Sequence, residues 1–199
     1  LYFSEFHGDV EYEMHNKMNF DIIIAGNHEY DNGMEQLAHY YKQVKAVKLC
    51  SNYDFTGTVL EGVFKPYYIK EFGNKKVGFI AANLNPYGMI AETNCKGIKF
   101  SDIIETSNKT AAMLKQEKGV DFVVLVSHIG YDMSGDGGTG DIDVVKNSTD
   151  IDLVIGGHTH TQIDPSKSSS PAWLVPNKEG RMVPVTQTGN WGKKVGLID

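Results

Sequence analysis

The sequence predicts a protein of the α/β class, in which buried parallel strands alternate with helices. Apolar runs at 22–24, 122–126 and 153–155 are typical of strands that are covered on both faces. Amphipathic segments flank the first run, which gives the order helix, strand, helix. The composition, 41% hydrophobic and 22% charged over 199 residues, is enough for one compact domain with its own core.

The first predicted helix covers residues 8–19. Val10, Met14 and Met18 recur at i, i+4 and i+8, so we expect this stripe to face the core and His15 to lie on the polar side. The strand at 22–24 follows this helix.

A second helix is predicted over 33–45, and it leaves His39 exposed. A short parallel strand at 47–50 comes next. Asp54 lies in the loop after it, where it could support a metal ligand, although an aspartate in a loop is usually a turn former. The stripe that we expect to face inward from this helix is Met34, Leu37, Tyr41 and Val44.

The middle of the chain predicts a hairpin and a long helix. The segments 67–72 and 76–82 flank Gly73-Asn74, a strong signal for an antiparallel pair, which we expect to start a second sheet layer. Ser101 is the expected N-cap of a helix that runs to about Lys118. Its inward residues are predicted to be Ile103, Ile104, Ala111 and Leu114.

The last third predicts shorter elements. The glycine-rich segment 135–140 lacks the spacing of a nucleotide-binding loop, so we interpret it as a surface loop. A short helix over 141–147 leads to the apolar run at 153–155. A Ser/Pro-rich excursion over 164–176 follows, and strands over 181–188 and 193–198 close the chain.

Composition also limits the possible partners. The net charge is −6 and the only arginine is Arg181, so there is no basic stripe for a nucleic-acid polymer. Cys50 and Cys95 form no disulfide framework. No apolar run approaches the roughly 20 residues of a membrane span. No signal peptide is visible, and the opening Leu1-Tyr2-Phe3 is typical of a helix interior.

Each of the three apolar runs ends in polar side chains that suit a metal ion. Asn27 and His28 follow the first run after Gly26, which we expect to allow a sharp turn; His128 follows the second; His158 and His160 follow the third. In open α/β sheets the carboxyl ends of strands form the ligand-binding edge. A lone histidine there is more often structural, but four histidines and an asparagine at three such ends indicate a metal site.

Imidazole suits zinc, manganese or iron. In extended backbone, residues i and i+2 share a face, so His158 and His160 are expected to point to the same place.

These segments carry a family resemblance. Gly26-Asn27-His28-Glu29-Tyr30-Asp31, then Ser127-His128-Ile129-Gly130, then Gly156-Gly157-His158-Thr159-His160 resemble the ordered motifs of the calcineurin-like metallophosphatases, and the first motif is similar to that of the 5'-nucleotidase branch. The segments 51–55 and 187–192 also look like parts of that branch. The resemblance covers nearly the whole chain.

The resemblance implies both a fold and a set of roles. The fold is a four-layer α/β/β/α sandwich of two mixed β-sheets flanked by helices. Asn27, His128 and His158 would bind one metal ion and His160 the other. His28 would then be a catalytic residue that stabilises the transition state or protonates the leaving oxygen, and Asp31 would orient its ring.

Part of the family pattern is not found in this sequence. The family also carries an Asp-x-His motif and a Gly-Asp motif before the first motif found here, and the latter aspartate bridges two metals. We interpret His7-Gly8-Asp9 as surface rather than as a substitute. Residues 1–199 are thus expected to be a partial catalytic domain, truncated at the N-terminus and without the C-terminal nucleotide-binding domain.

The expected activity is that of a phosphohydrolase with two divalent ions (zinc, manganese or iron) in the complete enzyme and at most one in this chain. The expected substrate is a nucleoside 5'-monophosphate or a related nucleotide, and the resemblance implies a secreted, periplasmic or cell-surface location. Alternatives are a cyclic-nucleotide phosphodiesterase or nucleotide-sugar hydrolase on the same site, or a non-catalytic metal-binding surface domain. Oligomeric state is not indicated by the sequence.

Overall fold

The computed structural model describes residues 5–198, so the expectation for Leu1-Tyr2-Phe3 lies outside the described residues. Its described residues form a mixed α/β fold whose sheets are flanked by helices, which confirms the predicted class. In chain order, the elements of the first half are α2 (Asp9–Met18), β1 (Ile22–Ile24), η1 (Asn27–Tyr30), α3 (Gly33–Tyr41), β2 (Val47–Leu49), β3 (Tyr53–Asp54), β4 (Tyr67–Phe72), β5 (Lys75–Asn83), α4 (Glu92–Cys95) and β6 (Lys99–Phe100).

The second half begins with the long helix that the sequence predicts. Its elements are α5 (Ile103–Glu117), β7 (Phe122–His128), η2 (Ser134–Asp136), α6 (Asp141–Lys146), β8 (Leu153–Ile155), β9 (Leu174–Pro176) and β10 (Met182–Thr186). None of the described helices is long and apolar enough to cross a membrane.

One six-stranded mixed sheet combines the first-half strands β4 and β5 with the strands of the second half, in the order β4-β5-β7-β8-β10-β9. Strands β5, β7, β8 and β10 are parallel, while β4 and β9 pair antiparallel at the two edges. Strands β1 and β2 form a separate parallel pair, and β3 pairs with β6. The predicted hairpin is therefore confirmed as β4–β5, and it lies in a different sheet from β1 and β2.

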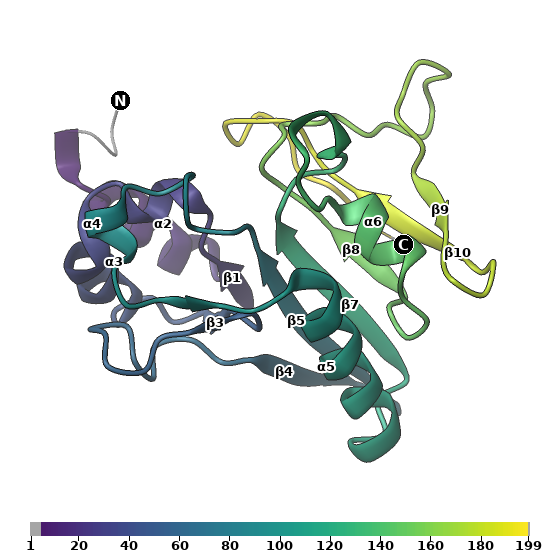
Figure 1. Cartoon of the computed structure of the whole chain (residues 1–199), viewed down its shortest axis with the longest axis horizontal. Helices are drawn as coiled ribbons and strands as arrows, with labels where there is room; N and C mark the ends of the chain where they lie inside the picture. The colour runs from purple at the N-terminus through teal and green to yellow at the C-terminus, as the bar shows by residue number, and fades with distance from the viewer. Residues whose placement is uncertain (1–4, 199) are drawn as a thin grey trace.

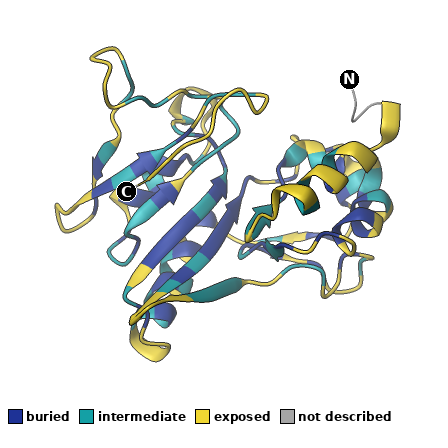
Figure 2. Ribbon diagram, turned by 180° about the vertical axis from the view of Figure 1, so that it is seen from behind, coloured by how far each residue is buried: buried dark blue, intermediate teal, exposed yellow. Residues whose placement is uncertain are grey.

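Two hydrophobic cores lie side by side (Figure 1). The first, here called the aromatic core, joins α2, α3 and the first strands, and its ring stacks include Tyr12 on Tyr40 at 4.5 Å and Phe55 on Phe64 at 4.9 Å between centroids. The second, the sheet core, is almost entirely aliphatic and packs α5 and α6 against the six-stranded sheet. Figure 2 shows its central strands as the most continuously buried part of the molecule.

Most of the predicted inward faces are confirmed. Met34, Leu37, Tyr41 and Val44 are buried and His39 is exposed. On α5, Ile103, Ala111 and Leu114 are buried.

The predicted face of the first helix was wrong. Val10, Met14 and Met18 are exposed, and Tyr12 is the buried residue of α2. His15 is half-buried, with its ring at the edges of Tyr12 and Phe20, and burial lowers its pKa. The ring stack between Tyr12 and Tyr40 rotates the helix, since a buried aromatic ring contributes more contact area than a methionine.

Two further predictions were wrong. Asp102, not Ser101, caps α5, because its carboxylate accepts the Glu105 N–H at 2.8 Å. Residues 193–198 form no strand, and Val195 and Leu197 are exposed. The apolar pattern at 193–198 suggested a strand, but a strand also needs a neighbour to pair with. Among the described residues no strand pairs with this segment.

Candidate active site

The first strand end brings Gly26 against the ring of His128. A β-carbon built on Gly26 would lie 2.6 Å from His128 Cε1, so only glycine allows this approach. The backbone at Gly26 is extended, with φ −92° and ψ −172°, so the expected conformational reason for this glycine was wrong and a steric one replaces it. The Gly26 N–H donates to Glu29 Oε2 at 2.5 Å, and the fully buried Tyr30 anchors the η1 turn.

His128 occupies the centre of the cluster. It ends β7, opposite Asn83 of β5, and its Nε2 lies 3.1 Å from Asn27 Oδ1. A β-carbon on Gly157 would lie 3.1 Å from His128 Nδ1, so glycines from two other strand ends flank the ring. Burial, followed by the neighbouring histidines 158, 28 and 160, lowers the pKa of His128 to about 4. The imidazole is therefore neutral near pH 7, the form that binds a metal ion.

His158 meets His128 edge to face, with 5.2 Å between ring centroids. Both His158 and His160 adopt left-handed backbone, at φ 82° and 56°, so the expected extended backbone at this motif was wrong. His160 turns toward Trp191, at 6.4 Å between centroids, and is exposed. Burial, and then His160, lowers the pKa of His158, so His160 still acts on it electrostatically.

Gln187 holds this unusual loop in place. Its Nε2 donates to the Gly157 carbonyl at 3.0 Å, and its Oε1 accepts from the Thr159 hydroxyl at 3.2 Å and from the Thr161 N–H. Left-handed backbone is uncommon for residues other than glycine and persists where the surroundings determine it. In the sequence, Gln187 stands out only as part of the family-like segment 187–192 and as a polar residue directly after the apolar strand β10.

His28 and Asp31 form the predicted pair. His28 Nδ1 lies 2.9 Å from Asp31 Oδ2, and the side chains are 78% and 55% exposed. The tight η1 turn explains the contact, because side chains at i and i+3 eclipse in a 3₁₀ helix. Asp31 leaves the other ring nitrogen of His28, Nε2, open to solvent.

Asn83, near the cluster, has a structural role and joins the two cores. Its Nδ2 donates to the Ala25 carbonyl. Its backbone N–H donates to Asn52 Oδ1, and its backbone carbonyl accepts from Asn52 Nδ2. Asn83 is 3% exposed, so its side chain serves the packing of the two cores.

Asp141, which the sequence analysis did not single out, is fully buried behind the strand ends. It accepts from the Ser127 hydroxyl, and burial raises its pKa to about 7. In the sequence, Asp141 lies at the start of a short helix where polar and apolar residues alternate, and nothing in that pattern indicates that its carboxylate is buried.

The donors fit a metal ion only in part. Asn27, His128 and His158 are neutral oxygen and nitrogen donors gathered from three strand ends, and neutral imidazole is a good ligand. Yet within residues 5–198 no group of three or more His, Cys, Asp or Glu side chains is placed to hold an ion.

The carboxylates of Asp9 and Asp54 are engaged outside the histidine cluster. Asp9 accepts from the Tyr40 hydroxyl, and Asp54 is a turn former that accepts from Thr56 N–H at 2.9 Å and pairs with Lys99 at 3.1 Å. The set therefore does not fit a two-metal centre by itself.

Comparison with known proteins gives a consistent result. A family model described as calcineurin-like phosphoesterase matches residues 3–162. The chain is 27% identical over its whole length to the trifunctional nucleotide phosphoesterase protein YfkN of Bacillus subtilis, covering 15% of that protein, and 26% identical to human 5'-nucleotidase, covering 35%.

Solved structures agree with this result. The 5'-nucleotidase precursor of Thermus thermophilus superposes with a TM-score of 0.79 at 30% identity, over 96% of this chain and 38% of that one. The NAD nucleotidase of Haemophilus influenzae gives 0.80 at 26% identity, over 94% and 37%. The chain thus spans at most about two fifths of the length of these relatives.

Proposed function

Because the chain belongs to the calcineurin-like phosphoesterase family, a family of metal-dependent hydrolases, we propose that its protein is a 5'-nucleotidase that releases phosphate from nucleoside 5'-monophosphates. The observation that carries the proposal is the contact of His128 with both Asn27 and His158, which joins three strand ends in one cluster. Relatives with 5'-nucleotidase names align over the full length of the chain.

In this proposal Asn27, His128 and His158 hold one divalent ion, and His160 contributes to a second. The ions are zinc, manganese or iron. Bound metal ions would supply charge neutralisation and an activated water. The described cluster contains no carboxylate to offset the charge of two dications, so two ions require ligands beyond this set.

His28 is the proposed catalytic acid. Asp31 holds its Nδ1 at 2.9 Å, which fixes the ring and leaves Nε2 as the atom that donates a proton to the leaving ester oxygen. The pair is exposed at the rim of the cluster, where a substrate can reach it. The proposed acid is therefore exposed to solvent, whereas the proposed metal ligand His128 is largely buried in the same site.

A direct test measures phosphate release from adenosine 5'-monophosphate by a longer form of the protein that includes the family's Asp-x-His and Gly-Asp motifs. We expect metal-dependent release, abolished by chelation and restored by added manganese or zinc. Cyclic nucleotides and nucleotide sugars serve as competing substrates in the same assay. Hydrolysis of those alone, with none of the monophosphate, would refute the 5'-nucleotidase assignment.

A further inference from the structure

One buried carboxyl group lies between two of the strand ends that form the histidine cluster. Asp141 is fully buried at the start of α6, and its Oδ1 accepts a hydrogen bond from the Ser127 hydroxyl. Its other oxygen, Oδ2, is buried without a hydrogen-bond partner among the described residues. Because a buried polar atom without a partner is costly, this side chain needs an explanation beyond packing.

Asp141 is not needed to begin its own helix. The N-terminus of α6 is capped by Asp143, whose carboxylate accepts the Gly140 N–H at 3.0 Å. Within residues 5–198, Asp141 also forms no ion pair that would explain a buried carboxyl group. Its backbone N–H donates to the Gly130 carbonyl at 2.7 Å, which ties the start of α6 to the loop after β7. The contacts of the side chain with the neighbouring strand ends therefore remain to explain it.

Each oxygen of the carboxyl group contacts a residue that leads to a histidine of the cluster. Ser127, which donates to Oδ1, directly precedes His128 in β7. Oδ2 lies against Gly156, since a β-carbon built there would be 2.1 Å from this oxygen. Gly156 precedes His158 by two residues. The carboxyl group thus reaches from one histidine-bearing strand end to the other.

The carboxyl group lies where the sheet no longer joins these two strands. The register of β7 with β8 ends at the pair Val126 and Ile155, whereas β7 stays paired with β5 as far as His128. Gln187 fixes the backbone from Gly157 onward, but among the described residues it bonds to none of β7. The bridge between the β7 and β8 ends is therefore the carboxyl group.

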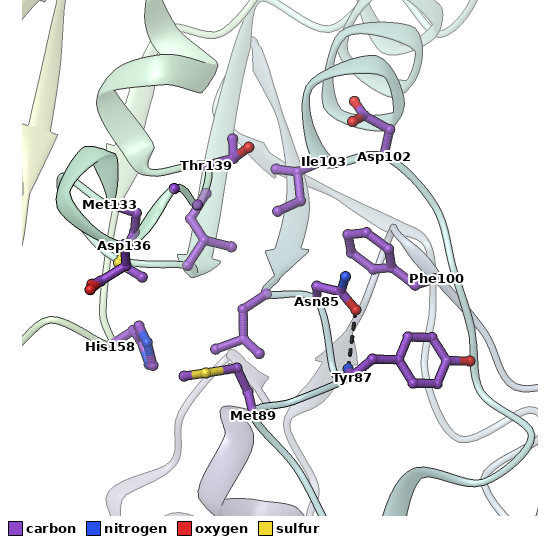
Figure 3. A pocket seen from close by; sticks show the side chains of 14 residues that line it. Asn85, Tyr87, Met89, Phe100, Asp102, Ile103, Met133, Asp136, Thr139 and His158 are labelled. Atoms are coloured by element: carbon purple, nitrogen blue, oxygen red, sulfur yellow. Dashed lines mark hydrogen bonds between the residues drawn. The ribbon is translucent and has the colours of Figure 1, made fainter. Parts of the chain in front are cut away.

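The other side of His158 offers little support. Its ring lines a pocket of about 340 Å³, with Met133 and Met89 in the same lining (Figure 3). The ring makes no hydrogen bond within residues 5–198, and it meets His128 edge to face at 5.2 Å between centroids. The position of His158 relative to His128 thus depends on the buried strand end behind it.

We infer that Asp141 is a positioning residue, whose carboxyl group holds the β7 and β8 ends at the separation that brings His128 and His158 together. The inference rests on the proposed function only where it treats the two histidines as metal ligands. Their separation is a property of the metal-free chain, so it can be measured without metal and without turnover.

The test measures the contact between the two rings directly. In the metal-free 199-residue chain labelled with ¹³C-histidine, NMR detects nuclear Overhauser effects between ring protons that are in contact. We expect this signal between His128 and His158, because their rings meet edge to face. It should be lost in Asp141→Ala and in Ser127→Ala, since each variant removes one half of the bridge. It should persist in Asp141→Asn, whose amide has the same shape and keeps an oxygen that accepts from Ser127.

Two matched controls separate positioning from a general loosening of the core. Val144→Ala removes a fully buried side chain from the same helix. Ser148→Ala removes a fully buried hydroxyl that donates one hydrogen bond, to the Val145 carbonyl at 3.0 Å. Both should leave the signal between the rings in place. Urea unfolding identifies any variant that is not folded.

Zinc titrations of the same variants give a second readout. Outer partners of metal-ligating residues typically change metal affinity by about 10–100-fold, and we expect a weakening of this size in Asp141→Ala and Ser127→Ala. Asp141→Asn and the two controls should bind zinc as the unchanged chain does. If Asp141→Ala does not fold, Ser127→Ala decides the question, because it keeps the carboxyl group and removes one hydroxyl.

The outcomes separate the two proposals. A ring-to-ring signal that survives in the folded Asp141→Ala and Ser127→Ala variants would overturn the inference, and so would its loss in Asp141→Asn or in either control. Loss of the signal in the first two variants only, with no zinc binding by the unchanged chain, supports the positioning role and counts against the proposed metal ligands. Zinc binding that is lost in His158→Ala but unchanged in Asp141→Ala, with the signal retained, does the reverse.

Discussion

The two cores of the molecule bring two very different histidines to one site. His28 comes from the aromatic core on a four-residue 3₁₀ turn, is 78% exposed, and is held by Asp31. His128 comes from the sheet core at the end of a seven-residue strand, and burial lowers its pKa to about 4. In the proposed function, the same kind of side chain therefore acts as an accessible proton donor at His28 and as a neutral metal ligand at His128.

The difference follows from the supporting structure. Strand β7 pairs with β5 and β8 on its two sides, so its end is rigid and covered. Within residues 5–198, strand β1 has three residues and pairs with β2 alone, and the chain leaves it in a tight turn. A buried, doubly paired strand suits a ligand that must stay in place, and an exposed turn suits a group that exchanges protons.

The largest expected effect concerns His28. In the phosphate-release assay proposed above, His28→Ala should reduce kcat by about 10²–10⁴-fold while metal content stays unchanged, because a general acid acts on the proton and not on the ion. His39→Ala, an exposed histidine outside the site, is the matched control. Loss of metal from His28→Ala would mean that His28 is a ligand and that the contrast with His128 fails.

The next effect compares the two cores. Leu125→Ala on β7 and Leu37→Ala on α3 remove fully buried side chains, and each should lower the free energy of unfolding by about 2–5 kcal/mol in urea. Only Leu125→Ala should also weaken zinc binding, since β7 carries His128. Equal weakening by both variants would show that the cluster does not depend on the sheet core in particular.

A smaller effect concerns Asp141 and pH. Its pKa is raised to about 7 in the fold, so the folded state binds the proton more tightly than the unfolded state, and stability falls as pH rises from about 4 to 7. Asp141→Asn should flatten this slope and raise the free energy of unfolding at pH 8 by about 2–4 kcal/mol. The check is urea unfolding at pH 5 and pH 8. A slope that survives the substitution would assign it to another group.

The smallest expected effect concerns Gly26. A β-carbon there would press on the His128 ring, so Gly26→Ala should destabilise the fold by about 1–3 kcal/mol and weaken zinc binding. Gly135→Ala is the control, because nothing lies within 4 Å of its β-carbon position. Thermal unfolding and a zinc titration measure both variants. An unaffected Gly26→Ala would show that the two strand ends are less closely joined than described.

Much of this arrangement follows from local sequence patterns. The apolar runs before Asn27, His128 and His158 predict strands, and parallel strands meet at one edge, so the sequence alone predicts that these residues gather. The pairing of His28 with Asp31 was implied by the family resemblance, and the three-residue spacing allows it in a tight turn. These features depend on contacts that are near in sequence or on the general geometry of sheets.

Other features depend on contacts that no local pattern reveals. Helix α2 turns Tyr12 inward because Tyr40 lies beside it, 28 residues later in the chain. The left-handed backbone at His158 and His160 is held by Gln187, from a different strand. The steric role of Gly26 requires the His128 ring, about 100 residues away. In each case a distant side chain decides the local conformation.

The most direct test of the central claim is a zinc titration of the 199-residue chain after dialysis against a chelator. We expect at most one zinc ion per chain, bound weakly, because Asn27, His128 and His158 are three neutral donors without a carboxylate. This binding should be lost in His158→Ala and retained in His39→Ala. Two tightly held ions per chain, or binding that is unaffected by His158→Ala, would contradict it.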